Sequence, residues 1–257
     1  MALGKVQPPR LEEAIGFYRA AVALRPQSDG AHYNLGLALG RKGDLDGAIA
    51  AYQEAIRLKK DHALAYNNLG FALANQKKLV EAVAAYRKAI ELKRDFALPY
   101  YNLGCVLRAQ KKLEEAVDAH RKAITLQADY ADAYSGLASV YNAQRKFDEA
   151  AAASSKAAEL SAAGTATAGA GGGNADALFN QGVILWNGGK IADAKKAFES
   201  AIQANPNHAE AHYQLGMALV NEGNLAGAAT EFESYLKLAP EGPNAAQAKA
   251  LVGQLKK

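Results

Sequence analysis

A Leu-Gly pair returns along the chain at intervals of 34 residues, and this regularity restricts the fold more than any other feature of the sequence. It occurs at 35–36, 69–70 and 103–104, weakens at 136–138, and resumes after a longer interval as Gln-Gly at 181–182 and as Leu-Gly at 215–216. A fixed period of this length is typical of stacked repeat architectures. The sequence therefore predicts an array of similar small units.

A second set of residues repeats in the same register. Alanines recur at spacings of 34, 34, 34, 34, 44 and 34 residues, at Ala14, Ala48, Ala82, Ala116, Ala150, Ala194 and Ala228. Four residues after most of them stands an aromatic residue, at Tyr18, Tyr52, Tyr86, Phe198 and Phe232, with His120 and Ser154 as exceptions. A spacing of four places two residues on one face of a helix, so both series indicate helices.

Each unit is predicted to be a pair of helices. In one unit, apolar residues at helical spacing occupy 69–73 and 79–90, and the polar turn 75–78 separates them. A glycine inside a helix costs roughly 1 kcal/mol, so the recurring mid-helix glycines indicate close approach of the facing helix. One hairpin cannot bury both of its faces, and stacking of neighbours into a solenoid must supply the stability.

The combined pattern resembles the tetratricopeptide repeat (TPR) family over about residues 10–242. The family signature is an aromatic residue, Leu-Gly, Tyr, Ala, an aromatic residue, Ala and a closing Pro. Two departures are local: Leu mostly replaces the second Tyr, and the closing Pro survives only at Pro26, Pro206 and Pro240. The resemblance implies an all-α fold, a right-handed superhelical solenoid of antiparallel helix pairs.

Five segments are expected: an N-terminal half repeat at 1–28, four repeats at 29–160, a Gly/Ala-rich insertion at 161–174, two further repeats at 175–242, and a C-terminal capping helix at 243–257. The insertion has the composition of a flexible tether. It is either a loop between stacked helices or a hinge between two blocks, and the sequence leaves both alternatives open.

Charge and composition argue against several classes of protein. The formal net charge is +4 and the pI is about 8.9, which is too mild a basic balance to indicate a nucleic-acid partner. No apolar run approaches the roughly 18 residues of a membrane-spanning helix, and the N-terminus lacks a secretory apolar core. A cytoplasmic protein without membrane association is expected. Cys105 is the single cysteine, which excludes an intramolecular disulfide.

No arrangement of residues points to catalysis. Cys105 occupies an ordinary helical repeat position, without a base that would make it a nucleophile. His208 and His212 lie one helical turn apart, but the His-Glu-x-x-His order and a third ligand are absent. The Gly-x-x-x-x-Gly-Lys phosphate loop is also absent. The chain is therefore predicted to be no enzyme and to hold neither a cofactor nor a metal.

The resemblance implies a binding groove, because the first helix of each hairpin lines the concave face in TPR proteins. The family's contact positions correspond here to Tyr33, Asn34, Asn67, Asn68, Phe71, Tyr101, Asn102, Cys105, Arg108, Phe179, Asn180, Trp186, Tyr213 and Gln214. One register of this chain contains Asn34, Asn68, Asn102 and Asn180. This register is similar to the asparagine ladder in the TPR region of O-linked N-acetylglucosamine transferases. A carboxamide both donates and accepts hydrogen bonds, as a peptide backbone requires. Alternatively, asparagine is merely a tolerated polar residue of the repeat.

The expected function is that of a non-catalytic scaffold that binds an extended protein or peptide partner in this groove. Two alternatives stay open because Met1 falls inside the first helix of a repeat. One is a structural solenoid that self-associates head to tail into filaments. The other is a detached TPR region of a larger multidomain bacterial protein.

A row of basic pairs recurs in the turns between paired helices, at Lys77-Lys78, Lys111-Lys112 and Arg145-Lys146. Such a row is usually a solvated edge. It could also steer an acidic partner toward the protein.

Overall fold

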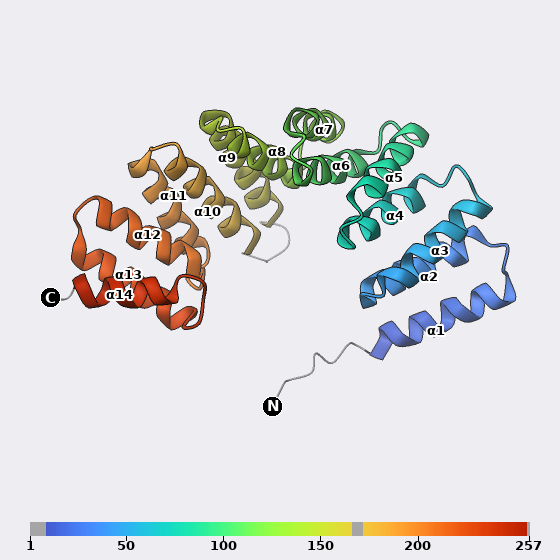
Figure 1. Cartoon of the computed structure of the whole chain (residues 1–257), viewed down its shortest axis with the longest axis horizontal. Coiled ribbons are helices and arrows are strands. Elements are labelled where there is room, and N and C mark those ends of the chain that lie inside the picture. The colour runs from blue at the N-terminus through green and yellow to red at the C-terminus, as the bar shows by residue number, and fades with distance from the viewer. Residues whose placement is uncertain (1–8, 166–171, 256–257) are drawn as a thin grey trace. The chain divides into compact units, whose positions relative to one another are not determined.

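The computed structural model describes residues 9–165 and 172–255, and these residues form fourteen α-helices and no strand (Figure 1). From α1 to α7 and from α8 to α14, consecutive helices pack against each other, and the closest packing occurs within the six predicted hairpins. The predicted all-α solenoid of antiparallel helix pairs is confirmed.

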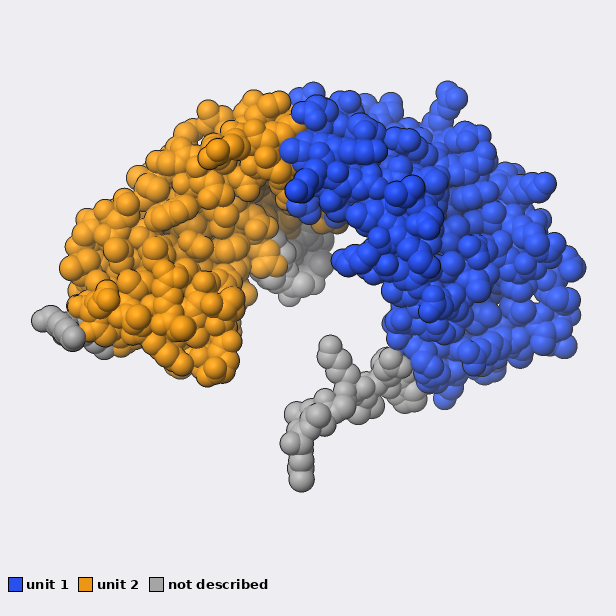
Figure 2. All heavy atoms as spheres, in the orientation of Figure 1, with its two compact units in different colours: residues 1–127 blue, residues 128–257 orange. Residues whose placement is uncertain are grey.

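The chain divides into two compact units, residues 1–127 and residues 128–257 (Figure 2). In unit 1, an unpaired helix precedes three hairpins: α1 (Pro9–Leu24), α2 (Asp29–Lys42), α3 (Leu45–Leu58), α4 (Ala63–Asn75), α5 (Leu79–Leu92), α6 (Ala97–Ala109) and α7 (Leu113–Leu126). In unit 2, three hairpins precede an unpaired helix: α8 (Ala131–Ala143), α9 (Phe147–Thr165), α10 (Gly172–Asn187), α11 (Ile191–Ala204), α12 (Ala209–Asn221), α13 (Leu225–Leu238) and α14 (Ala245–Leu255).

The connection between helices in the Gly/Ala-rich segment is shorter than the composition of the segment predicts. Helix α9 continues to Thr165 and α10 begins at Gly172, so 161–165 and 172–173 are helical rather than part of a loop. Alanine is the strongest helix former, and the alanine-rich end of α9 explains this extension. Residues 166–171 lie outside the described part of the chain. Helices α9 and α10 pack against each other, as the stacked alternative requires.

In five of the six hairpins, a repeating glycine of the first helix faces an aromatic ring of the second helix; the α8–α9 hairpin has Ala138 at this position. A Cβ atom built on Gly70 would lie 2.8 Å from Cε1 of Tyr86, and one on Gly216 would lie 2.7 Å from Cε1 of Phe232. Both rings are almost fully buried. The glycines therefore let the second-helix ring lie against the backbone of the first helix, which is the close approach that the sequence predicts.

We expect Gly70→Ala to lower the free energy of unfolding by about 1–3 kcal/mol, because Tyr86 has to move away from the new methyl group. Gly30→Ala, in the helix of the preceding hairpin, is the matched control. A Cβ there meets no atom within 4 Å, so the variant should gain up to about 1 kcal/mol from helix propensity. Urea denaturation of both variants measures the difference, and equal effects would contradict the packing described here.

Candidate functional site

Three first helices of unit 1, α2, α4 and α6, lie side by side. Contacts join α2 to α4 and α4 to α6, and side-chain hydrogen bonds cross both boundaries. We call the surface made by these helices the first-helix face of unit 1. Its predicted site residues are Tyr33, Asn34, Asn67, Asn68, Phe71, Tyr101, Asn102, Cys105 and Arg108.

Four polar side chains on this face form a continuous row of hydrogen bonds, which we call the carboxamide chain. Asn102 Nδ2 donates to Asn67 Oδ1 at 3.1 Å, and Asn67 Nδ2 donates to Asn68 Oδ1 at 3.1 Å. Asn68 Nδ2 then donates to Tyr33 Oη at 3.0 Å. The row links three successive repeats through side chains alone, so the orientation of each carboxamide depends on that of its neighbours.

The members of the carboxamide chain differ in their exposure. Asn67 is only 2% exposed, because it occupies the position that Tyr33 and Tyr101 hold in the neighbouring repeats. Those two rings pack on second-helix rings in the hairpin interior. Asn67 therefore positions its neighbours and is not available to a ligand, contrary to the expectation for this residue. Asn68 and Asn102 are half-buried, and each keeps one amide N–H and carbonyl lone pairs for a ligand.

A pocket of about 310 Å³ opens beside the carboxamide chain. It is lined by Leu37, Gly40, Arg41, Leu45, Tyr52, Asn68, Phe71 and Ala72. Leu37 and Phe71 are equivalent positions in successive repeats, which is the sequence signal that could have located the pocket. Phe71 is 57% exposed although it is a large apolar residue. The same helices expose further apolar surface at Leu64 and Leu98.

The tyrosines of this region keep their protons at neutral pH. Burial raises the pKa of Tyr52 to about 12, with a small opposing effect of the Arg41 guanidinium. Burial also raises the pKa of Tyr33, against which the hydrogen bond from Asn68 acts weakly. A protonated Tyr33 hydroxyl can accept the bond from Asn68 and still donate one of its own.

The remaining predicted residues of unit 1 are Cys105 and Arg108 of α6 and Asn34 of α2. Cys105 is half-buried at the position equivalent to Leu37 and Phe71, and Arg108 is exposed in the last turn of the helix. Asn34 of α2 is half-buried. These positions agree with the register of the first helices, and none of them belongs to the carboxamide chain.

In unit 2, the predicted residues do not form an equivalent row. Tyr213 is only 5% exposed and packs against Phe232 and Tyr235 at centroid distances of 5.6 and 5.3 Å, so it is a core residue. Phe179 and Trp186 are partly buried against this core. Asn180 is exposed and Gln214 half-buried, and in the described part of the unit no hydrogen bond joins them.

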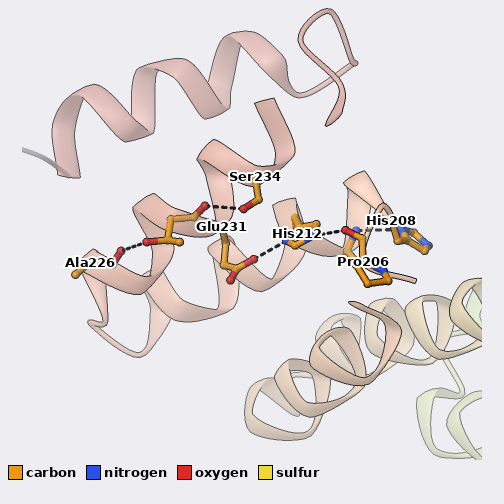
Figure 3. A network of polar contacts seen from close by, with 8 residues as sticks. Pro206, His208, His212, Ala226, Glu231 and Ser234 are labelled. Atoms are coloured by element: carbon orange, nitrogen blue, oxygen red, sulfur yellow. Dashed lines mark hydrogen bonds and ion pairs between the residues drawn. The ribbon is translucent and has the colours of Figure 1, made fainter. Parts of the chain in front are cut away.

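The histidine pair of α12 serves the structure (Figure 3). His208 is the N-cap of the helix, and its Nδ1 accepts a hydrogen bond from the Ala211 amide at 3.2 Å. The ring nitrogens of His212 instead face Glu231 Oε2 at 2.6 Å and the Pro206 carbonyl at 3.0 Å. The two imidazoles therefore have separate partners and do not converge on one point.

Within residues 9–165 and 172–255, no three His, Cys, Asp or Glu side chains are grouped in a way that could hold a metal ion. In the same ranges, no helix is both long and apolar enough to span a bilayer.

An array of stacked helical hairpins with a row of polar and apolar side chains on its first helices is a repeat scaffold of the protein-interaction class. Models of the tetratricopeptide repeat match residues 10–43, 41–77, 63–96, 85–118, 104–144 and 179–243. The chain belongs to the tetratricopeptide repeat family.

Solved structures of TPR proteins superpose on the chain. The crystal structure of YrrB, a TPR protein with an unusual peptide-binding site, is 27% identical, with a TM-score of 0.60 over 79% of this chain and 100% of that one. PilF of Pseudomonas aeruginosa is 19% identical, with a TM-score of 0.70 over 88% of this chain and 98% of that one. Yeast Tom70 is 15% identical, with a TM-score of 0.63 over 96% of this chain and 58% of that one. No curated protein sequence matches the chain.

Proposed function

We propose that the first-helix face of unit 1 binds an extended polypeptide. The observation that carries this proposal is the carboxamide chain, which presents half-buried amides with coupled orientations beside an apolar pocket. The likeness to YrrB, a TPR protein with a peptide-binding site, supports it.

Each part of the face has a role in this proposal. The remaining N–H and carbonyl groups of Asn68 and Asn102 pair with the backbone of the ligand and do not depend on its side chains. The pocket between Leu37 and Phe71 accepts one apolar side chain of the ligand, which gives sequence preference. Aromatic side chains such as Phe71 supply contact area with little loss of rotamer freedom.

Peptides selected for binding from a random display library test the proposal. Asn68→Ala/Asn102→Ala should weaken the selected peptides at least about tenfold in calorimetry, since each unpaired polar partner costs about 1–3 kcal/mol. Phe71→Ala should weaken only those peptides that carry an apolar residue at a fixed position.

Asn207→Ala/Asn221→Ala is the matched control, because it removes two exposed asparagines from unit 2. It should leave the affinity unchanged. Equal affinities for the wild type and the Asn68→Ala/Asn102→Ala variant, or crosslinks from the peptide only outside residues 29–109, would refute the proposed site.

End-to-end self-association is a second candidate function, favoured by the surface of α1. Phe17 and Leu24 of this helix are 74% and 83% exposed. Sedimentation over a wide concentration range should then show growing particles that Phe17→Ser/Leu24→Ser abolishes. A monomer at every concentration would exclude this function. The polar exposed side of α14, with Gln247, Lys249 and Gln254, argues against it.

A further inference from the structure

The turns between paired helices share one backbone conformation. In each hairpin, one residue of the turn has a positive φ angle, a conformation that favours glycine. In the turn between α2 and α3 it is the first residue after the first helix, and in the other five turns it is the second. These residues are Gly43 (89°), Lys77 (63°), Lys111 (61°), Arg145 (61°), Gly189 (76°) and Gly223 (78°). The next residue is the N-cap of the second helix where a cap is assigned.

Two of these turns contain the residues that such a backbone favours. Gly43 precedes Asp44, whose carboxylate accepts a hydrogen bond from the Gly47 amide at 2.9 Å. Gly223 precedes Asn224, whose side-chain oxygen accepts one from Gly227 at 3.0 Å. Glycine at the positive φ angle and Asp or Asn at the N-cap are the stabilising choices at these positions.

The Lys77-Lys78 and Lys111-Lys112 turns have neither a glycine at the positive φ angle nor an Asp or Asn at the N-cap. Lys77 and Lys111 hold a positive φ angle without being glycine. Lys78 and Lys112 make no side-chain capping bond, and their charge stands at the helix end where the helix dipole disfavours a cation. The stability of the turn therefore does not explain why lysine occupies these four positions, since two other turns of the same chain have the more stabilising glycine followed by Asp or Asn.

The four lysines are also available to a partner. All are exposed, and in the part of the chain that the structure describes none of their side chains forms an ion pair or a hydrogen bond. Of the two equivalent lysines of unit 2, Lys146 and Lys190, the second differs, because Lys190 pairs with Asp148. An unpaired charge that lowers the stability of its own turn indicates a role other than folding.

We propose that Lys77, Lys78, Lys111 and Lys112 form a basic edge of unit 1 that binds an acidic polypeptide segment. The edge lies at the turns, apart from the first-helix face, and the proposal does not depend on the proposed function of that face. Neighbouring packed helices lie about 10 Å apart, and an extended chain advances about 3.3 Å per residue. An acidic residue at every third position of the bound segment would therefore place its carboxylates opposite successive lysine pairs.

The surroundings of the lysines favour a polypeptide over a nucleic acid or a membrane. Residues 74–81 and 108–115 contain no aromatic side chain on which a base could stack. Exposed carboxylates, Glu81 and Glu115 among them, stand within one helical turn of the lysines. They would repel a phosphate backbone or an anionic bilayer, whereas a protein partner can pair them with cations of its own.

The test replaces the lysines by the residues of the Gly223-Asn224 turn, in the variant Lys77→Gly/Lys78→Asn/Lys111→Gly/Lys112→Asn. The matched control, Lys59→Asn/Lys60→Asn/Lys93→Asn/Arg94→Asn, removes the same number of charges from the opposite ends of the helices in the same unit. The probe is a fluorescent peptide with glutamate at every third residue, measured by anisotropy at low ionic strength. A glutamine version of the peptide, single-stranded RNA and vesicles of anionic lipid are the comparison probes.

The first variant should bind the glutamate peptide at least about tenfold more weakly than the wild type, because four charge pairs are lost. It should also unfold at a higher temperature, since glycine and an N-cap replace the lysines. The control should bind like the wild type. Equal binding by the first variant, equal binding of the glutamine peptide, or preference of the basic edge for RNA or vesicles would overturn the proposal.

Discussion

Replacement of His120 by phenylalanine is expected to raise the free energy of unfolding of unit 1 by about 2 kcal/mol. His120 is fully buried, and neither Nδ1 nor Nε2 has a hydrogen-bond partner. It stands against Gly104, where four of the five other hairpins have Tyr52, Tyr86, Phe198 and Phe232. A phenyl ring fills the same space without the two unsatisfied nitrogens, and urea denaturation at neutral pH measures the gain.

The destabilising effect of His120 should grow as the pH falls. Burial lowers the pKa of His120 to about 4, so the unfolded chain takes up the proton first, near its ordinary pKa of about 6.5. This titration costs the folded state no stability above pH 6.5, and the free energy of unfolding decreases as the pH falls from 6.5 toward 4. The total loss is about 3 kcal/mol.

His120→Phe should remove this pH-dependent loss, and its stability should change less than that of the wild type between pH 7 and pH 5. Tyr86→Phe is the matched control, because it alters the same repeat position without removing a group that titrates in this range. It should keep the wild-type pH profile. A pH profile of His120→Phe that parallels the wild type would show that His120 is not the responsible group.

Phe198→Ala is expected to lower the free energy of unfolding of unit 2 by about 3–5 kcal/mol, since it leaves a cavity in a tightly packed hairpin. Phe198 is fully buried and packs against Phe179 at a centroid distance of 5.9 Å. In repeat proteins each unit is stabilised by its immediate neighbours. Hydrogen exchange should therefore show a loss of amide protection in α10 to α13, while the amides of α2 to α5 keep theirs.

Phe198→Leu serves as the control for this experiment. It keeps most of the apolar volume and should reduce protection in the same helices by a smaller amount. If Phe198→Ala lowered protection uniformly in both units, the chain would unfold as one cooperative block and the prediction would be wrong.

The sequence predicts the hairpins well because each repeat specifies them independently. A glycine in the first helix, an alanine and an aromatic residue in the second, and a polar turn between them recur in register, and the structure places them as expected. Local composition was less reliable at the Gly/Ala-rich segment. There the helix-forming tendency of the alanines lengthens α9 to Thr165, although small residues also suit a loop.

The candidate site could be predicted only as a set of positions. The register places Asn67 and Tyr213 on first helices, but it does not reveal that both side chains turn inward and are buried. Nor does it reveal the bonds between Asn67, Asn68 and Asn102, since these depend on side-chain orientation within α4 and across the boundary between α4 and α6. Repeat spacing predicts the face of a helix, whereas hydrogen-bond partners require the packed structure.

The hydrogen bonds of the carboxamide chain all donate in one direction, from Asn102 toward Tyr33. Turning over a single carboxamide would place two oxygens or two N–H groups against each other, so the amides reverse together or not at all. A joint reversal restores every bond, because the Tyr33 hydroxyl can donate as well as accept. The row therefore has two self-consistent polarities. A hydrogen-bonding group placed against Asn102 selects one of them, and the choice is transmitted to Tyr33, two repeats away.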